Sequence, residues 1–189
     1  MTFETYQKEM PHKTKFYSSR RSTWWVLPSV YWFRSPQSSF QKNGYEYEYQ
    51  RSKVYKTEEQ IFGGTPQQCY LGTGVIEKYI QSFWKTKWFK KRFGEHKKAP
   101  KVRLSNRTTS AWCDISNSTL IFSSITHIPQ WLILHEVAHL FGNRCLAPHG
   151  RYFCRSYLSL IKHEYGSQVY KELQDGFEAN KIKYKPLDT

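Results

Sequence analysis

The chain has 189 residues, with 29 lysines and arginines against 15 acidic residues, and a formal net charge of +14. This length allows one domain, or one domain with an appendage, and the charge favours negative partners such as nucleic acid, an anionic membrane surface or an acidic protein. The polar N-terminus lacks the apolar segment of a signal peptide, and no apolar run approaches the ~20 residues of a membrane span, which argues against secretion and membrane insertion.

The cysteines point to a reducing compartment. All four are widely spaced, and none forms a Cys-x-x-Cys pair, as expected of free thiols. We therefore expect a cytoplasmic protein, or one of the host cytoplasm if the protein is viral.

Residues 1–50 are predicted to form a basic, aromatic N-terminal extension, followed by a main domain over residues 51–189. Within the extension, residues 24–33 are rich in aromatic side chains but are interrupted by Pro28. Such a run is compatible with a strand pair on the core, a partner-docking patch or a platform that stacks unpaired bases. Residues 45–49 alternate tyrosine with glutamate, which is typical of a half-exposed strand.

Two helices are predicted next, one over residues 51–62 that ends at Gly63-Gly64 and one over residues 74–93. Basic residues crowd the end of the second helix and continue beyond it. Cations favour a helix C-terminus, but this does not explain the continuation of the charge. We interpret this segment as a phosphate-contacting patch, formed by Lys90, Lys91, Arg92, Lys97 and Lys98.

Residues 101–107 and 111–124 are predicted to be strands. Two apolar runs in the second segment flank the turn residues 116–118, a pattern that indicates a β-hairpin. After Gly166 we expect one more helix, over residues 169–177, and a basic tail.

The motif that carries chemistry lies in residues 132–141, Leu-Ile-Leu-His-Glu-Val-Ala-His-Leu-Phe. Residues four apart on a helix share one face, so His135 and His139 can bind one metal ion. Glu136 lies beside them as a general base, an arrangement typical of zinc hydrolases. The alternative is a buried helix that carries two structural histidines.

A catalytic zinc site takes three protein ligands, and the chain offers several candidates for the third. Cys145 stands where the metzincin pattern requires histidine, and no methionine follows the site, which excludes that pattern. His149 precedes a further amphipathic stretch, and Glu164 would lie on the helix that this stretch predicts. On spacing alone, His149 is the leading candidate, and Glu164 and Cys145 stay open.

His135-Glu136-x-x-His139 followed by His149-Gly150-x-x-Phe153 resembles the SprT-like zinc metallopeptidases, and still more the small metallohydrolases of phages and actinobacteria. The resemblance covers roughly residues 51–166 and includes an upstream segment, residues 51–59. It implies a zincin-like α+β fold with a small antiparallel sheet, the metal-binding helix and flanking helices. It also implies His149 as the third ligand of Zn²⁺. The separate cysteine-rich zinc segment of some SprT-like proteins is absent.

The main functional hypothesis is therefore a zinc-dependent metallopeptidase that acts on proteins associated with nucleic acid. One alternative is a nucleic-acid-binding or virion-type structural protein that retains a zinc-stabilised scaffold, and another is a non-peptidase hydrolase. The resemblance further implies that residues 120–124 form an edge to which a peptide adds. The candidates for stabilising an oxyanion are Tyr152, Arg151 and His127, and Asp114 is the suggested outer partner of a ligand histidine.

Overall fold

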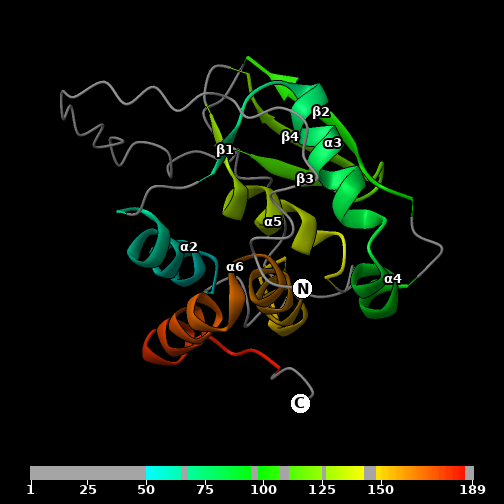
Figure 1. Cartoon of the computed structure of the whole chain (residues 1–189). Coiled ribbons are helices and arrows are strands. Elements are labelled where there is room, and N and C mark those ends of the chain that lie inside the picture. The colour runs from blue at the N-terminus through cyan, green and yellow to red at the C-terminus, as the bar shows by residue number, and fades with distance from the viewer. Residues whose placement is uncertain are drawn as a thin grey trace, which may run out of the picture. The chain divides into compact units, whose positions relative to one another are not determined.

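The computed structural model of the protein describes residues 50–64, 68–94, 98–106, 111–124, 127–142 and 148–185. The predicted extension up to residue 49, with its aromatic run and its alternating segment, lies outside these residues. The described helices are α2 (Gln50–Phe62), α3 (Thr73–Trp84), α4 (Lys87–Phe93), α5 (Gln130–His139) and α6 (Arg151–Ala179), shown in Figure 1. The strands are β1 (Cys69–Tyr70), β2 (Lys101–Ser105), β3 (Trp112–Asp114), β4 (Thr119–Ser123) and β5 (Ile128–Pro129).

The main sheet has three strands in the order β2-β4-β3. The predicted hairpin is confirmed: β3 pairs antiparallel with β4, and the Asp114 carboxylate accepts hydrogen bonds from the backbone and side-chain amide of Asn117 in the turn. However, β2 pairs with β4 in parallel. The expected antiparallel sheet is therefore wrong for this pair, because the hairpin returns β4 between β2 and β3, where it runs in the same direction as β2. All five residues of β4 are buried, as expected of a central strand.

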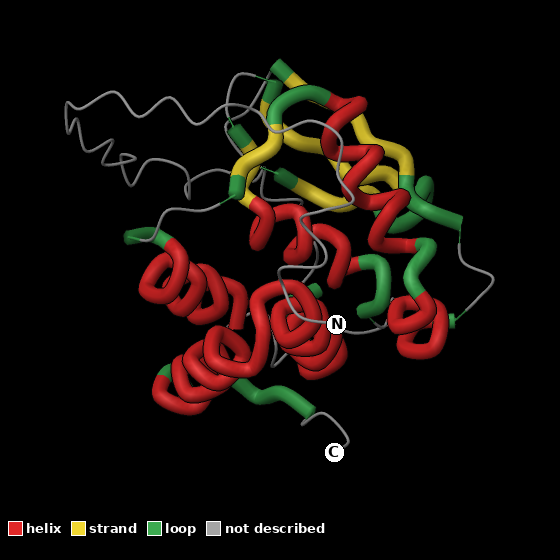
Figure 2. Tube along the Cα trace, viewed as in Figure 1, coloured by secondary structure: helices red, strands yellow, loops and turns green. Residues whose placement is uncertain are grey.

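The helices form the second part of an α+β architecture. In Figure 2, α5 lies between the strands and the pair formed by α2 and α6. Helix α5 contacts β3, β5 and α6, while α3 contacts β2. Consequently nine of the ten residues of α5 are buried, and three polar types, glutamine, histidine and glutamate, are held inside the core.

The core supports α5 from both sides. The largest fully buried side chains include residues of the sheet and of α6, both of which contact α5, and residues of α5 itself. They include Phe122, Leu120, Ile133, Leu134, Tyr157 and Leu158.

No helix in the described ranges is both long and apolar enough to cross a membrane.

The predicted helix over residues 74–93 is wrong in one respect, because it is two helices. Thr86 adopts an extended conformation and begins α4, with its hydroxyl accepting a hydrogen bond from the Phe89 amide. Threonine at this position is a strong helix start, which competes with continuation of α3. The break lets Phe89 turn inward, where it is fully buried against Trp84.

The predicted separation at Gly166 is confirmed. Gly166 has a φ of 86°, which interrupts the helical geometry inside α6. The first part of α6 begins at Arg151, just after His149, and its buried face lies against α5. The second part packs beside α2, where a Cβ on Gly176 would lie 2.6 Å from Cγ2 of Thr57.

Candidate metal centre

Three buried histidines converge between α5 and the start of α6. His135 and His139 lie on α5, as the four-residue spacing predicts, and His149 precedes α6 by two residues. Their candidate ligand atoms all lie within 4.8 Å of one another. The three histidines predicted as ligands are therefore brought together, and the site is at least compatible with a bound metal.

The distance between two of the histidines fits a shared tetrahedral ion. Nε2 of His135 and Nε2 of His149 are 3.3 Å apart. Two nitrogens that each lie about 2.0–2.1 Å from one tetrahedral zinc ion would be roughly 3.3–3.4 Å apart. Burial lowers the pKa of all three imidazoles, in the case of His135 to about 3. They are consequently neutral at pH 7, which is the form that binds a metal.

Two of the histidines form a hydrogen bond that holds the ring in place. Nδ1 of His135 lies 2.6 Å from Oε1 of Glu58, which is fully buried on α2. The His139 ring hydrogen-bonds the backbone carbonyl of Pro148. A carboxylate or carbonyl acceptor on one nitrogen leaves the lone pair of the other free for a metal, the usual arrangement of ligand histidines.

The packing of Phe153 explains why the His-Gly-x-x-Phe segment carries an aromatic residue at its last position. Its ring lies 4.9 Å from His135, 4.5 Å from His139 and 4.9 Å from His149, measured between ring centroids. Phe153 is almost fully buried on the first turn of α6. One apolar ring therefore packs against all three imidazoles and keeps water away from one side of them.

Gln50 fixes the segment that carries His149. Its side-chain amide donates to the backbone carbonyl of His149 at 3.0 Å and to that of Lys183 at 3.2 Å. Its amide oxygen accepts from the backbone amide of Lys183 at 2.5 Å. The first residue of α2 thus joins the third histidine to the segment after α6.

The same face of α2 presents Arg51, Tyr55 and Glu58, which are spaced by four and three residues. The ring centroid of Tyr55 lies 5.5 Å from that of His135 and 5.2 Å from that of His149. Arg51 lies 5.6 Å from the centre of the Tyr55 ring and hydrogen-bonds that side chain. Burial, with the nearby Glu136 charge, raises the pKa of Tyr55 to about 12.

Glu136 is buried beside the histidines. Burial and the neighbouring Glu58 charge raise the pKa of Glu136 to about 8, against the opposing effect of Arg51. Within the described part of the chain, its Oε2 atom has no hydrogen-bond partner. A buried carboxylate oxygen normally accepts a hydrogen bond. The lack of a partner for Oε2 is therefore consistent with a site that binds water or a cation.

The charges around the histidines also fit a divalent cation. Two buried carboxylates, Glu58 and Glu136, and one half-buried guanidinium, Arg51, surround three neutral imidazoles. A positive ion among the histidines would oppose the raised pKa of Glu136 and favour its ionised form. Imidazole ligands suit zinc, although other transition metals also accept them.

Glu164, the alternative third ligand, is engaged elsewhere. Its Oε2 atom accepts hydrogen bonds from Tyr79 at 2.9 Å and Gln130 at 2.8 Å, and its Oε1 atom lies 2.8 Å from Nδ1 of His163. The convergence of His149 with the helix histidines therefore favours His149 over Glu164. The other alternative, Cys145, lies outside the described residues.

Three further expectations about the site are wrong or unsupported. The outer partner of a ligand histidine is Glu58, whereas the Asp114 carboxylate is used by the β-turn. Residues 120–124 do not form an edge, because β4 is paired on both sides, while β3 is the end strand nearest α5. The candidate oxyanion donors Tyr152, Arg151 and His127 are exposed. Within the described residues, no contact joins Tyr152 to the three histidines.

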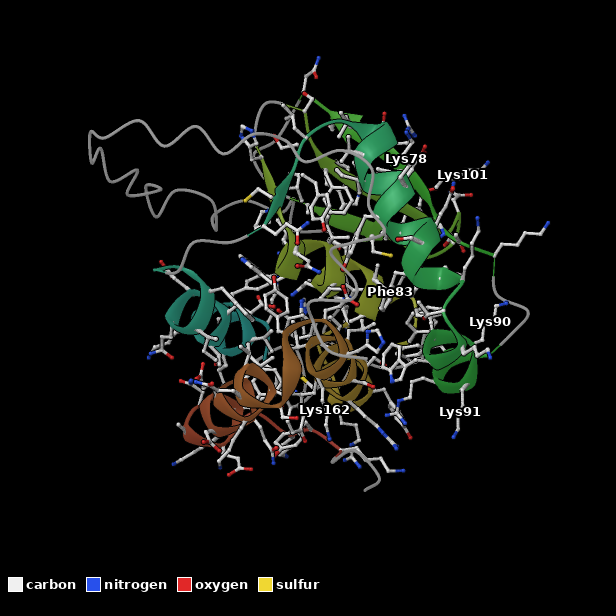
Figure 3. The ribbon with its side chains drawn as sticks, viewed as in Figure 1. Lys78, Phe83, Lys90, Lys91, Lys101 and Lys162 are labelled. Atoms are coloured by element: carbon white, nitrogen blue, oxygen red, sulfur yellow. The ribbon has the colours of Figure 1, made fainter. Side chains whose placement is uncertain are left out.

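The predicted nucleic-acid residues fall into three groups. Lys90, Lys91 and Lys98 are exposed, and Figure 3 shows the first two extending outward from α4. Arg92 is half-buried and donates to the Ser159 hydroxyl at 3.0 Å, so part of its role is to join α4 to α6. Lys97 lies outside the described residues.

The residues that sequence reasoning missed all lie on α2. The helix was predicted and residues 51–59 belong to the family resemblance, but no residue of its polar face was assigned a role at the site. The available signal was the spacing of Arg51, Tyr55 and Glu58 along one helical face, which indicates a shared environment without identifying it.

Protein-family models, curated proteins and solved structures were each compared with the chain, and none matches.

Proposed function

We propose that the protein is a zinc-dependent metallopeptidase, with His135, His139 and His149 as ligands and Glu136 as the general base. The observation that carries this proposal is the buried triad of neutral histidines beside a carboxylate oxygen that lacks a hydrogen-bond partner among the described residues. The resemblance of both motifs to SprT-like metallopeptidases supports the same reaction class. Glu58 and Phe153 provide the hydrogen bond and the packing that such a site needs.

The residues divide the chemistry between them. When bound by the three histidines, Zn²⁺ supplies Lewis acidity, which polarises a carbonyl and lowers the pKa of water from about 15.7 to roughly 7. Glu136 accepts a proton from the attacking water at Oε2 and delivers it to the leaving amine. Glu58 holds the Nδ1 proton of His135, so that Nε2 keeps its lone pair. Arg51 keeps a positive charge near Glu136 and favours its ionised form.

The decisive experiment compares the parent protein with Glu136→Gln after loading with zinc. We expect about one zinc per chain in both proteins by mass spectrometry, and cleavage of labelled casein by the parent alone. Loss of a general base typically reduces the rate by about 10²–10⁴-fold. A variant as active as the parent contradicts the role of Glu136, and a zinc-loaded parent that cleaves no protein or peptide in a broad library contradicts peptidase activity.

A second candidate function is binding of nucleic acid on the outer face of α4 and β2. Exposed lysines lie on these elements and in the segment before β2, and none makes a salt bridge with a described carboxylate. They are Lys87, Lys90, Lys91, Lys98 and Lys101. This surface supports a proposal that the substrates are proteins associated with nucleic acid, or that binding is itself the function.

The charge-reversal pair Lys90→Glu and Lys91→Glu tests this surface, with Lys56→Glu, an exposed lysine of α2, as the matched control. Affinity for a fluorescent 20-nucleotide DNA should fall with salt in the parent, and the pair should reduce the salt slope by about 2, one unit for each lost contact. Equal slopes for parent, pair and control would exclude this surface. Glu136→Gln should not change the affinity in either case.

A further inference from the structure

Tyr55 brings a phenol to the metal centre from a helix that carries none of the ligands. We propose that the Tyr55 hydroxyl is a catalytic hydrogen-bond donor that stabilises the oxyanion formed during hydrolysis, and that Arg51 is a positioning residue which holds this hydroxyl in place. The inference rests on the proposed function. It assigns a side chain to the stabilisation of the oxyanion, a role that Glu136 does not fill.

The position of the ring is the first argument. Tyr55 contacts His149 edge-on at 5.2 Å and lies tilted against His135 at 5.5 Å, between ring centroids. It therefore lies beside two of the three ligands, on a different element from Phe153, which packs against all three. Tyr55 is only half-buried, whereas the three histidines are buried. A side chain at this boundary can contact both the centre and a substrate.

The polar end of Tyr55 is the second argument. The Glu136 charge acts on the phenol, so the hydroxyl lies in the field of the general base. Arg51 hydrogen-bonds Tyr55 and, as a cation, acts on Glu136 and on all three histidines. An arginine has only donors, so the phenol oxygen accepts the hydrogen bond from Arg51. Accepting one hydrogen bond strengthens the bond that a hydroxyl donates.

The chemistry is that of an oxyanion donor. As water adds to the carbonyl carbon, negative charge develops on the carbonyl oxygen, and a fixed donor that faces this oxygen stabilises the transition state more than the ground state. Tyr55 donates a hydrogen bond and keeps its proton. Proton transfer from water to the leaving amine passes through Glu136 alone.

Other aromatic hydroxyls near the site are less suitable. Tyr157 is fully buried and its hydroxyl faces Glu58 on the far side of His135. Tyr152 is 41% exposed on the first turn of α6. Tyr55 alone among these three combines contact with two ligand rings, partial exposure and the field of Glu136.

The test uses Tyr55→Phe in the full chain, with Tyr152→Phe as the matched control, because both changes remove one hydroxyl and keep the ring. Zinc content is measured first and should equal that of the parent in both variants. Cleavage of labelled casein should fall by about 10²–10³-fold in Tyr55→Phe through kcat, with little change in KM, and should be unaffected in Tyr152→Phe. Equal kcat values for Tyr55→Phe and the parent would overturn the inference.

A binding assay separates this inference from the proposed function. Acetohydroxamate is an anion that binds metals through its oxygens. It is titrated into the cobalt-loaded proteins, and its binding is followed by visible absorption. Tyr55→Phe should weaken its binding by about tenfold or more, the loss of one hydrogen bond to a charged group. If the parent binds acetohydroxamate but cleaves no peptide, the peptidase proposal fails while weaker binding by Tyr55→Phe still supports the donor. Equal binding by the two proteins, or none by the parent, overturns the donor.

Arg51 is tested by a double-mutant cycle. Arg51→Met should lower casein cleavage when Tyr55 is present and change it little in the Tyr55→Phe background, because a positioning residue acts through the group that it holds. Arg51→Lys should restore part of the activity. Equal effects of Arg51→Met in both backgrounds would show that Arg51 acts independently of the phenol.

Discussion

Oε1 of Glu58 lies 2.6 Å from Nδ1 of His135, although 77 residues separate them in the sequence. Both side chains are almost fully buried. This contact joins α2 to the metal-binding helix and sets which nitrogen of His135 faces the other histidines. It also makes Glu58 the most informative residue of the centre after the ligands themselves.

Glu58→Gln should therefore weaken zinc binding without abolishing it. The amide is nearly the same size as the carboxylate, but it lacks the negative charge that favours the Nδ1 proton of His135 and supports a cation on Nε2. Loss of such an outer partner typically costs about 10–100-fold in metal affinity. The measurement is competition with a zinc chelator at pH 7.5.

Glu164→Gln is the matched control for that substitution. Glu164 also accepts hydrogen bonds from neighbouring side chains, Tyr79 and Gln130, but in a separate network. Its replacement should leave zinc affinity within about twofold of the parent. Equal weakening by both variants would mean that general destabilisation, and not the contact with His135, sets the affinity.

The third ligand can be identified by metal content. His149→Ala should lose most of the bound zinc, because two histidines alone leave the ion with too few protein ligands. His163→Ala removes a histidine whose ring centroid lies 3.9 Å from that of Trp88 and whose Nδ1 atom is hydrogen-bonded to Glu164. Zinc retention by His149→Ala, or loss by His163→Ala, would contradict the assignment.

Gln50 should matter for the position of His149. Gln50→Ala removes the hydrogen bond to the His149 carbonyl and both bonds to Lys183, and buried groups left without partners cost about 1–3 kcal/mol each. We expect a lower melting temperature and weaker zinc binding. Gln60→Ala, an exposed position at the other end of α2, is the control and should change neither. Normal zinc affinity in Gln50→Ala would show that Gln50 serves stability alone.

The close approach of α6 to α2 predicts the effect of a single methyl group. In Gly176→Ala the new Cβ would lie 2.6 Å from Cγ2 of Thr57, so the helices must separate. Overpacking of this kind costs about 1–3 kcal/mol, more than the roughly 1 kcal/mol gained from the better helix propensity of alanine. We expect a lower melting temperature.

Two further variants test whether the contact with Thr57 causes the loss of stability in Gly176→Ala. Gly74→Ala places its Cβ in open space within α3 and should be neutral or slightly stabilising. Thr57→Ser removes the methyl group that clashes and keeps the hydroxyl, which hydrogen-bonds Lys53 and Asn180. The combination with Gly176→Ala should recover most of the lost stability. A Gly176→Ala protein as stable as the parent would show that the helices adjust freely.

Local patterns in the sequence determined much of the centre. The four-residue spacing of His135 and His139 requires only a helix, and the position of Glu136 follows from the same geometry. The hairpin of β3 and β4 likewise follows from two apolar runs around a turn. His149 was favoured by its own motif, and its place beside the helix histidines agrees with that expectation.

Tertiary structure alone decided which distant groups complete the centre. Glu58, Tyr55 and Arg51 reach the histidines because α2 lies against α6. Glu164 instead accepts hydrogen bonds from Tyr79 and Gln130, which favours His149 as the third ligand. The parallel pairing of β2 with β4 was likewise invisible to the sequence. The physical reason is common to these cases: helix and turn spacing is set by neighbours in the chain, whereas contacts across 77 residues depend on how whole apolar faces pack.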